Sequence, residues 1–573
     1  MNHVIVLRFA LAWCVANTFV TGFVFAQDST MELTPVPATV RVRMDGTIPS
    51  QTSATLHAAR GEFESLQVVV TAKGGRLTGV DAEIGPFSNA AGAQLPPQAS
   101  TLYRVSYVPV RYSAPRATEP PGLTPDPLVP LIDPYAGQKN AAPKWDGEKL
   151  EGAPFGAVPF EVWPGQHQPL WLDVKAPADA APGEYTATLR VRAKESLAEL
   201  PITLTVWDFA LPSGPTHENH FGGADRVASY HKVEQGSDAY LDIEERYSQM
   251  FADHRINPSL PRRLCPRPGE DGSVSFDTAA KDNITAFVSK FNVTNIEIPH
   301  APFNETSDRA KALAFYRSWY AFLADNGWAD RSYLYMLDEP NTAEAYERVR
   351  ELGALVREAE PRIRRLVVEQ TYTQDPAWGT LEDSIDIWCP LFGFVDGASI
   401  DRLTKQGGTV WSYTALVQTA PPYHPEYEKV ANDLPPFWAI DFPLASYRIA
   451  PWLNWRYGIT GLLYWSSVYW GSPDRNPWQD PGFRVRWNGE GALLYPGTDA
   501  GIEGPVASIR LKALRDGMED YEYFALLASL GKREEADAIV REAVPTWGTW
   551  NQDPLAIPAL RERLAQAILA AKR

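Results

Sequence analysis

The sequence predicts a two-part chain, a β-sandwich followed by a (β/α)8 barrel with C-terminal helices. The first observation is that residues 31–211 contain short alternating apolar and polar segments separated by Pro, Gly and Ala clusters, a pattern typical of a sandwich. The second is that strand-like and helix-like segments alternate from residue 215 onward, which indicates a parallel sheet. The third is the length, because 573 residues exceed what one hydrophobic core serves. The expected segments are 1–26 (export signal), 31–211 (sandwich), 215–530 (barrel) and 531–573 (helical extension).

The N-terminal residues resemble a cleaved secretory signal. Arg8 precedes an apolar run, and small residues lead up to Ala26, where cleavage is expected. The run approaches the length of a membrane span, so an uncleaved anchor is the alternative. A lipoprotein signal on Cys14 is disfavoured because bulky Trp13 precedes it. We expect a periplasmic or secreted protein with no membrane span in the mature chain.

The sandwich is predicted from segments such as "SLQVVVTA", "EYTATLRVRA" and "LPITLTVWDF". The Pro-rich stretch 115–148 interrupts this pattern, and we expect a long loop there. Long ordered loops are often lids or linkers. Whether this one reaches an active site is open from the sequence.

The barrel is predicted from eight candidate strands separated by amphipathic segments. The helix over 341–360 is the clearest, with Thr342 as its cap. A doubly wound sheet is the alternative, but the chain lacks its Gly-rich phosphate loop. The expected strands are 219–223, 256–261, 295–300, 333–339, 365–371, 385–390, 409–414 and 461–467.

Composition narrows the partners. The formal charge of −17 disfavours nucleic acid and anionic membrane surfaces. The 19 Trp, 24 Tyr and 23 Phe suit sugar binding, although large cores also use aromatic residues. Cys265 and Cys389 allow one disulfide at most and have no zinc-site spacing. We expect no cofactor and no metal, and the sequence does not indicate an oligomeric state.

Chemistry-bearing residues gather at the predicted carboxyl ends of the strands, where barrel active sites lie. They include no metal-binding HExxH, no GxSxG nucleophile elbow and no strand-end Lys, which leaves carboxylate chemistry and favours glycoside hydrolysis. These residues are His220, Arg262, His300, Asp338, Glu339, Glu369, Gln370, Trp388, Trp411, Tyr413, Tyr464 and Trp465.

The adjacent acids Asp338 and Glu339 end the strand "YLYMLDE". We expect Pro340 to hold Glu339 in the extended region and both carboxylates to reach one cavity. The structural alternative is that Asp338 caps the next helix or pairs with Arg262.

The seventh predicted strand, "TVWSYT", ends without a carboxylate, so the second acid of a retaining glycosidase is missing there. A 2-acetamido sugar could supply its own nucleophile. In that mechanism Asp338 would orient the acetamido group, Glu339 would be the acid/base, and Trp411 and Tyr413 would form an aromatic wall with a hydroxyl donor. The alternatives are a non-acetamido sugar with Glu369 as nucleophile, or a non-catalytic carbohydrate-binding barrel.

Three stretches resemble glycoside hydrolase family 123 and the wider group carrying the domain of unknown function 4091. They are "GQHQPLWLDVKAPADAAPGEYTATL", "YLYMLDEP" and "GEGALLYPG…GPVASIRLKALRDGMEDYEY". The resemblance implies an exo-acting, retaining β-N-acetylgalactosaminidase that uses substrate assistance on GalNAc-containing oligosaccharides or glycoconjugates. Its catalytic pair would fall on Asp338 and Glu339. Its substrate-binding residues would include Tyr413, Trp411 and Trp465.

Four further residues are expected to bind the substrate: His220, His300, Arg262 and Gln370. His220 and His300 are expected to do so through hydrogen bonds to sugar hydroxyls. The dense charges of "RLKALRDGMEDYEY" are expected to lie on a surface helix, with Arg515 and Glu519 as an i,i+4 pair of small value. "LLYPG" is expected to be a turn over the pocket rim.

Overall fold

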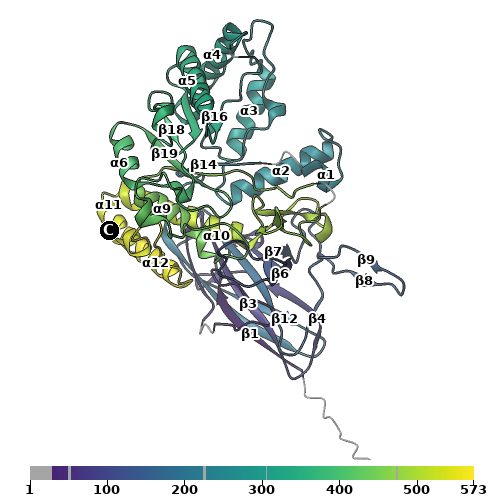
Figure 1. The fold of residues 1–573 in the computed structure, drawn as a ribbon. Coiled ribbons are helices and arrows are strands. Elements are labelled where there is room, and N and C mark those ends of the chain that lie inside the picture. The colour runs from purple at the N-terminus through teal and green to yellow at the C-terminus, as the bar shows by residue number, and fades with distance from the viewer. Residues whose placement is uncertain (1–28, 50–52, 224–226, 305, 473–474, 573) are drawn as a thin grey trace, which may run out of the picture.

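The computed structural model describes residues 29–49, 53–223, 227–304, 306–472 and 475–572. The export signal expected at 1–26 lies outside these ranges. Figure 1 shows the sandwich strands below and the parallel sheet with its helices above, joined by α10 (Ile509–Ser529). Within the described ranges, no helix has both the length and the apolar character needed to cross a membrane.

Two sheets pack face to face in the N-terminal half. Alternation along β3 and β12 places Val68 and Leu189 in one shared core, so the strand signals of the sequence translate directly into a sandwich. The first sheet has the order β1 (Thr30–Pro37), β3 (Phe63–Lys73), β11 (His167–Lys175), β6 (Ser100–Val110), β7 (Gly122–Pro130). The second has the order β10 (Phe160–Val162), β4 (Leu77–Ile84), β12 (Gly183–Arg192), β13 (Leu197–Ala210), β2 (Thr55–Arg60), with β5 (Ser88–Asn89) beside β12.

One long loop was expected over residues 115–148, but part of this stretch forms strands. It contains β7, which pairs with β6 from Val110↔Gly122 to Tyr103↔Pro130. The prolines are tolerated because β7 is an edge strand of its sheet. The stretch also contains β8 (Lys144–Trp145), which forms a projecting hairpin with β9 (Leu150–Glu151).

The second half is built on a seven-stranded parallel sheet. Its strands in spatial order are β14 (Glu218–Phe221), β20 (Gly461–Tyr464), β19 (Thr409–Thr414), β18 (Ile387–Trp388), β17 (Arg364–Val368), β16 (Ser332–Asp338) and β15 (Ile296–Glu297). The helices are α1 (Val227–His231), α2 (Asp238–Asp253), α3 (Thr278–Lys290), α4 (Arg309–Asp325), α5 (Ala343–Ala359), α6 (Gly397–Lys405), α7 (Tyr427–Val430), α8 (Ala445–Arg448), α9 (Ala450–Tyr457), α10, α11 (Arg533–Ala543) and α12 (Ala556–Ala571). Two short hairpins follow β20, β21 (Gly482–Phe483) with β22 (Trp487–Asn488) and β23 (Leu494–Pro496) with β24 (Pro505–Ala507).

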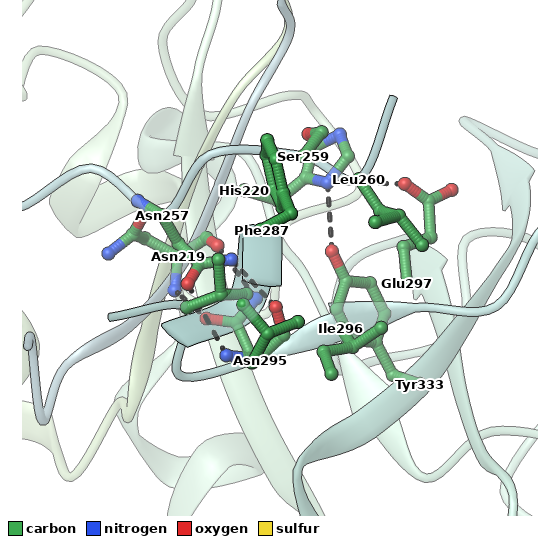
Figure 2. Close-up of a pocket in the computed structure, with 12 residues that line it drawn as sticks. Asn219, His220, Asn257, Ser259, Leu260, Phe287, Asn295, Ile296, Glu297 and Tyr333 are labelled. Atoms are coloured by element: carbon green, nitrogen blue, oxygen red, sulfur yellow. Dashed lines mark hydrogen bonds and ion pairs between the residues drawn. The ribbon is translucent and has the colours of Figure 1, made fainter. Parts of the chain in front are cut away.

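Residues 256–261, expected to form a strand, do not form one. The sheet therefore has seven strands and ends at β14 and β15, and it does not close into the expected eight-stranded barrel. Three asparagines link these ends (Figure 2). The Asn257 backbone N–H donates to Asn219 Oδ1 at 2.7 Å, and its side-chain Nδ2 donates to the Asn295 carbonyl at 2.6 Å. Asn295 Nδ2 donates to the Asn219 carbonyl at 2.9 Å. Side-chain amides thus satisfy backbone groups that a strand ladder would otherwise pair.

Helix α5 begins as predicted, because Thr342 Oγ1 accepts a hydrogen bond from the Ala345 N–H at 3.1 Å. Val349, Leu352 and Val356 are buried on its inner face. The cap is Thr342, so Asp338 is free of that structural role.

Helix α10 was expected to carry surface ion pairs, and this expectation is wrong. Arg510 and Arg515 are fully buried, and each pairs with a sandwich carboxylate. Arg510 Nε lies 2.8 Å from Asp126 Oδ1, and Arg515 Nη1 lies 3.0 Å from Asp173 Oδ2. Removing one partner of such a pair leaves the other charge buried and unpaired, at a cost of about 3–5 kcal/mol. The helix therefore joins the two halves of the chain.

Candidate active site

The carboxylate pair lies at the carboxyl end of β16. Asp338 is the last residue of the strand, and the Glu339 N–H donates to the Val368 carbonyl of β17 at 3.1 Å. Both side chains are exposed. The expectation of an extended Glu339 is wrong, because its φ is +43°. A left-handed conformation costs a non-glycine residue about 1–2 kcal/mol, so the chain stores strain at the pair.

Two tyrosines hold the two carboxylates. The Tyr335 hydroxyl donates to Asp338 Oδ1 at 2.9 Å, and the Tyr413 hydroxyl donates to Glu339 Oε1. Burial raises the pKa of Tyr413 well above its ordinary value, and the neighbouring Glu339 charge raises it further. Burial, followed by Asp338, raises the pKa of Tyr335 in the same direction. Both phenols therefore stay protonated and fix the direction of one oxygen of each acid.

Cys389 lies just beyond β18 and is buried, and neither it nor Cys265 forms a disulfide. Burial raises the pKa of the Cys389 thiol well above its usual range, and the charge on Asp338 adds to the effect. A protonated thiol is a poor nucleophile, so Cys389 supplies no nucleophile for this site.

Glu369 is 4% exposed. Its Oε1 accepts hydrogen bonds from the Tyr346 hydroxyl at 2.9 Å and from Gln370 Nε2. Burial raises the pKa of Glu369 to about 8, and the Glu339 charge acts in the same direction. The carboxyl is therefore largely neutral at pH 7, whereas a covalent nucleophile must be ionised.

Replacing Glu369 with Gln is expected to remove a pH dependence of stability. The folded chain keeps the Glu369 proton up to about pH 8, whereas an unfolded Glu releases it near 4.5. The stabilisation is therefore complete below pH 4.5 and is lost as the pH rises to about 8. Between pH 5 and pH 8, urea denaturation should show the free energy of unfolding of the wild type falling relative to the variant by about 1–3 kcal/mol. A constant difference across this range would contradict the assignment.

Trp411 does not line the site, contrary to the prediction. Its side chain is fully buried, its Nε1 donates to Glu218 Oε2 at 3.2 Å, and its ring centroid lies 5.1 Å from that of Tyr333. Glu218 begins β14, so the indole lies at the amino end of the sheet. A Cβ on Gly461 would come within 2.4 Å of the indole, so the glycine makes room for Trp411.

Trp465 follows the last residue of β20 and is half-buried. Its Nε1 donates to Glu490 Oε1 at 2.7 Å. Its ring centroid lies 5.0 Å from that of Tyr469 and 5.7 Å from that of Phe483. These contacts form an aromatic cluster after the carboxyl end of β20.

His220 lines a groove beside the asparagine cluster (Figure 2). Its Nδ1 lies 2.8 Å from the Tyr333 hydroxyl and 3.6 Å from Glu297 Oε2, and its ring centroid lies 5.7 Å from that of Tyr335. Because the Tyr335 hydroxyl donates to Asp338, a series of side-chain contacts connects the groove with the carboxylate pair.

Arg262 and His300 are exposed, and Arg262 lies on a short 3-10 helix (Arg262–Leu264). Among the described residues, neither side chain hydrogen-bonds or ion-pairs with Asp338 or Glu339. The alternative in which Asp338 pairs with Arg262 therefore finds no support. Their roles toward a substrate stay predictions.

Several neighbours of the site were missed by sequence reasoning. Tyr335 had a visible signal, three positions before Asp338 on one strand. Tyr423 lies in a loop and is 39% exposed; burial raises its pKa to about 12, with further effects of Glu369 and Glu339. Glu490 lies just before "LLYPG". That stretch was expected to be a rim turn, whereas Leu494–Pro496 form β23.

A comparison with models of protein families matches residues 273–527 to the glycoside hydrolase 123 catalytic domain. Residues 273–527 are therefore similar to a glycoside hydrolase family 123 catalytic domain. The predicted resemblance is confirmed. The match covers α3, the carboxylate pair, the Trp465 cluster and most of α10, and it makes glycosidic bond hydrolysis the chemistry to be explained.

Among solved structures, the chain is similar to a family 123 glycoside hydrolase from Clostridium perfringens, described in a study of glycolipid glycan hydrolysis. The TM-score is 0.65 at 13% identity, with 94% of this chain and 98% of that chain covered, which supports the fold. A β-glucuronidase from Parabacteroides merdae matches at a TM-score of 0.27 and 10% identity, over 87% of this chain and 52% of that chain. No curated protein matches the chain.

Proposed function

We propose that the chain is an exo-acting, retaining glycoside hydrolase that releases terminal β-linked N-acetylgalactosamine by substrate-assisted catalysis. The observation that carries the proposal is the difference in exposure between the carboxylate pair and Glu369. Asp338 and Glu339 are exposed and each is held by a tyrosine hydroxyl. Glu369, the nucleophile of the alternative mechanism, is buried with its pKa raised to about 8.

In the first step, Asp338 accepts a hydrogen bond from the acetamido N–H and directs the acetamido carbonyl oxygen at C1 of the sugar. That oxygen forms a bond to C1 while the glycosidic C1–O bond breaks, and Glu339 donates its proton to the departing oxygen. The product is a cyclic oxazolinium, whose positive charge the Asp338 carboxylate stabilises.

In the second step, water attacks C1 from the face that the leaving group vacated, and Glu339 takes a proton from it. The bond between C1 and the former acetamido oxygen breaks, which opens the oxazolinium ring and restores the acetamido group. Two inversions give overall retention of configuration. Tyr413 holds Glu339 through both steps, because its phenol stays protonated.

The substrate is proposed to be the GalNAc end of an oligosaccharide or glycoconjugate. The Clostridium perfringens relative is described as acting on glycolipid glycans, so a glycolipid headgroup is one such substrate to test. Export to the periplasm or the medium belongs to the proposal through the signal expected at residues 1–26.

A plate of aryl β-glycosides, with and without the 2-acetamido group, tests the proposal. We expect turnover of the N-acetylgalactosaminide, weaker turnover of the N-acetylglucosaminide and only a residual rate on the plain galactoside, together with inhibition by a GalNAc-thiazoline. Labelling of Glu369 by a 2-fluoro glycoside would establish the alternative mechanism. Thiazoline binding without turnover of any glycoside would indicate a non-catalytic binding protein.

A further inference from the structure

The loop 489–492 places a buried carboxylate behind Trp465. Glu490 is 2% exposed. Its Oε1 accepts from Trp465 Nε1 at 2.7 Å and from the Tyr464 hydroxyl at 3.5 Å, and the Leu416 backbone also hydrogen-bonds the carboxyl group. One side chain thus ties together the segments that follow β19 and β20. Since Thr414 pairs with Tyr464, this junction lies next to Tyr413, the partner of Glu339.

Arg510 of α10 holds the loop itself. Its Nη1 donates to the Gly489 carbonyl at 3.1 Å, and its Nη2 donates to the Ala492 carbonyl at 2.6 Å. Gly489 has φ +72°, and a Cβ there would lie 2.9 Å from the guanidinium carbon. The glycine therefore permits both the turn and the close approach of Arg510. The guanidinium grips the loop on both sides of Glu490.

Asp126, on strand β7 of the sandwich, holds Arg510. The two form a bidentate pair, with Nε to Oδ1 at 2.8 Å and Nη2 to Oδ2 at 2.9 Å, and both side chains are fully buried. The Tyr495 hydroxyl also donates to Asp126 Oδ2 at 2.5 Å. Paired N–H donors fix the plane of the guanidinium as well as its position. A continuous series of contacts therefore leads from the sandwich to the indole of Trp465.

We propose that Glu490 is a positioning residue that fixes the Trp465 indole as a sugar-binding wall, and that Asp126 and Arg510 carry this position from the sandwich to the site. An aromatic ring contributes to sugar binding only when its face is held in the right plane. The proposal rests on the proposed function, because it takes Trp465 as part of the sugar site. It also explains why the "GEGALLYPG" and "RLKALRDGMEDYEY" stretches occur together, since each supplies one part of the same support.

A double-mutant cycle tests the role of Glu490. Glu490→Met keeps the side-chain volume and removes the acceptor, and Trp465→Phe keeps an aromatic ring and removes the donor. A wall that contacts substrate and transition state alike affects KM rather than kcat. We expect Glu490→Met to raise KM about three- to tenfold, as the loss of one buried hydrogen bond implies, with kcat changed less than about threefold. In the Trp465→Phe background, its effect on KM should fall below about twofold.

Asp537→Met is the matched control, because Asp537 Oδ1 also accepts from an indole, that of Trp455, at 2.8 Å outside the site. We expect no change in KM there. Glu490→Gln retains an acceptor and should restore KM to within about threefold of the wild type. Multiplicative effects of Glu490→Met and Trp465→Phe on KM would overturn the proposal, as would an equal rise of KM in the Asp537 variant.

Arg510→Lys and Asp126→Asn extend the test to the sandwich, and they replace the first cycle if Glu490→Met does not fold. Each should raise KM in the wild type and lose that effect in the Trp465→Phe background, whatever it does to thermal stability. Lowered stability with unchanged KM would reduce both residues to a structural role and overturn that step. The cycles are read on whichever glycoside of the aryl panel the wild type hydrolyses, so failure of GalNAc turnover would reject the proposed function without deciding the role of Glu490.

Discussion

Replacing Glu339 with Gln is expected to lower kcat on an alkyl β-N-acetylgalactosaminide by about 100- to 10,000-fold, the range that general acid–base catalysis supplies. The amide can still accept the Tyr413 hydrogen bond, but it has no proton to donate to the leaving oxygen. The loss should shrink as the leaving group becomes more acidic, because a dinitrophenolate departs without protonation. Initial rates on a series of glycosides of decreasing leaving-group pKa measure this dependence.

Two controls separate this chemistry from damage to the fold. Glu344 is an exposed glutamate in the first turn of α5, and Glu344→Gln should leave kcat unchanged. Azide should rescue Glu339→Gln on the activated substrate by trapping the oxazolinium as a β-glycosyl azide. A variant that hydrolyses the alkyl glycoside at the wild-type rate would remove Glu339 from the mechanism.

The acidic strand end and the helix after it were predictable because their signals are local. A buried strand ends in two acids, and Thr342 then caps an amphipathic helix. The backbone conformation between them was not predictable. Pro340 favours an extended preceding residue, yet Glu339 is left-handed. The preference that a proline imposes on the residue before it is overridden here, because the surrounding sheet and loop set the direction of the chain.

Trp411 shows the limit of alternation along a strand. Trp411 and Tyr413 lie two residues apart on β19 and therefore on the same face. They differ in depth. Trp411 pairs with Gly461 at the start of β20, whereas Tyr413 pairs with Leu463 near its end. The sequence period gives the face, but the register against a strand some 50 residues away decides which ring lies beside the carboxylate pair.

The charges of α10 show what spacing alone cannot reveal. The i,i+4 pair is present, with Arg515 Nε 3.8 Å from Glu519 Oε2, but both residues are buried. Their environment depends on Asp173, more than 300 residues earlier in the chain. From the sequence alone, a helix with many charged residues looks like one that faces solvent, because its distant partners in the sandwich are not visible. Glu490 was missed for the same reason, since its burial depends on contacts that the loop sequence does not show.

Replacing Asp338 with Asn should produce a loss that depends on the acetamido group of the substrate. The amide keeps the size of the side chain but lacks the negative charge that stabilises the oxazolinium. We expect kcat on an aryl β-N-acetylgalactosaminide to fall about 100- to 1,000-fold, the usual cost of removing one preorganised electrostatic contact. Any residual rate on the aryl β-galactoside should change less than about threefold, since that sugar has no acetamido group to orient. Rates on the two substrates, measured with the same aryl leaving group, give the comparison.

Tyr335→Phe is a milder test of the same role of Asp338. It removes the hydroxyl that donates to Asp338 Oδ1 and keeps the charge, so the same substrate-dependent loss should appear at about tenfold or less. Affinity for a GalNAc-thiazoline should weaken in the same order, with Asp338→Asn the weaker binder, because the inhibitor resembles the intermediate that the carboxylate stabilises. Equal losses on the two sugars would mean that Asp338 acts on a part of the substrate common to both, and the acetamido group would then not be the nucleophile.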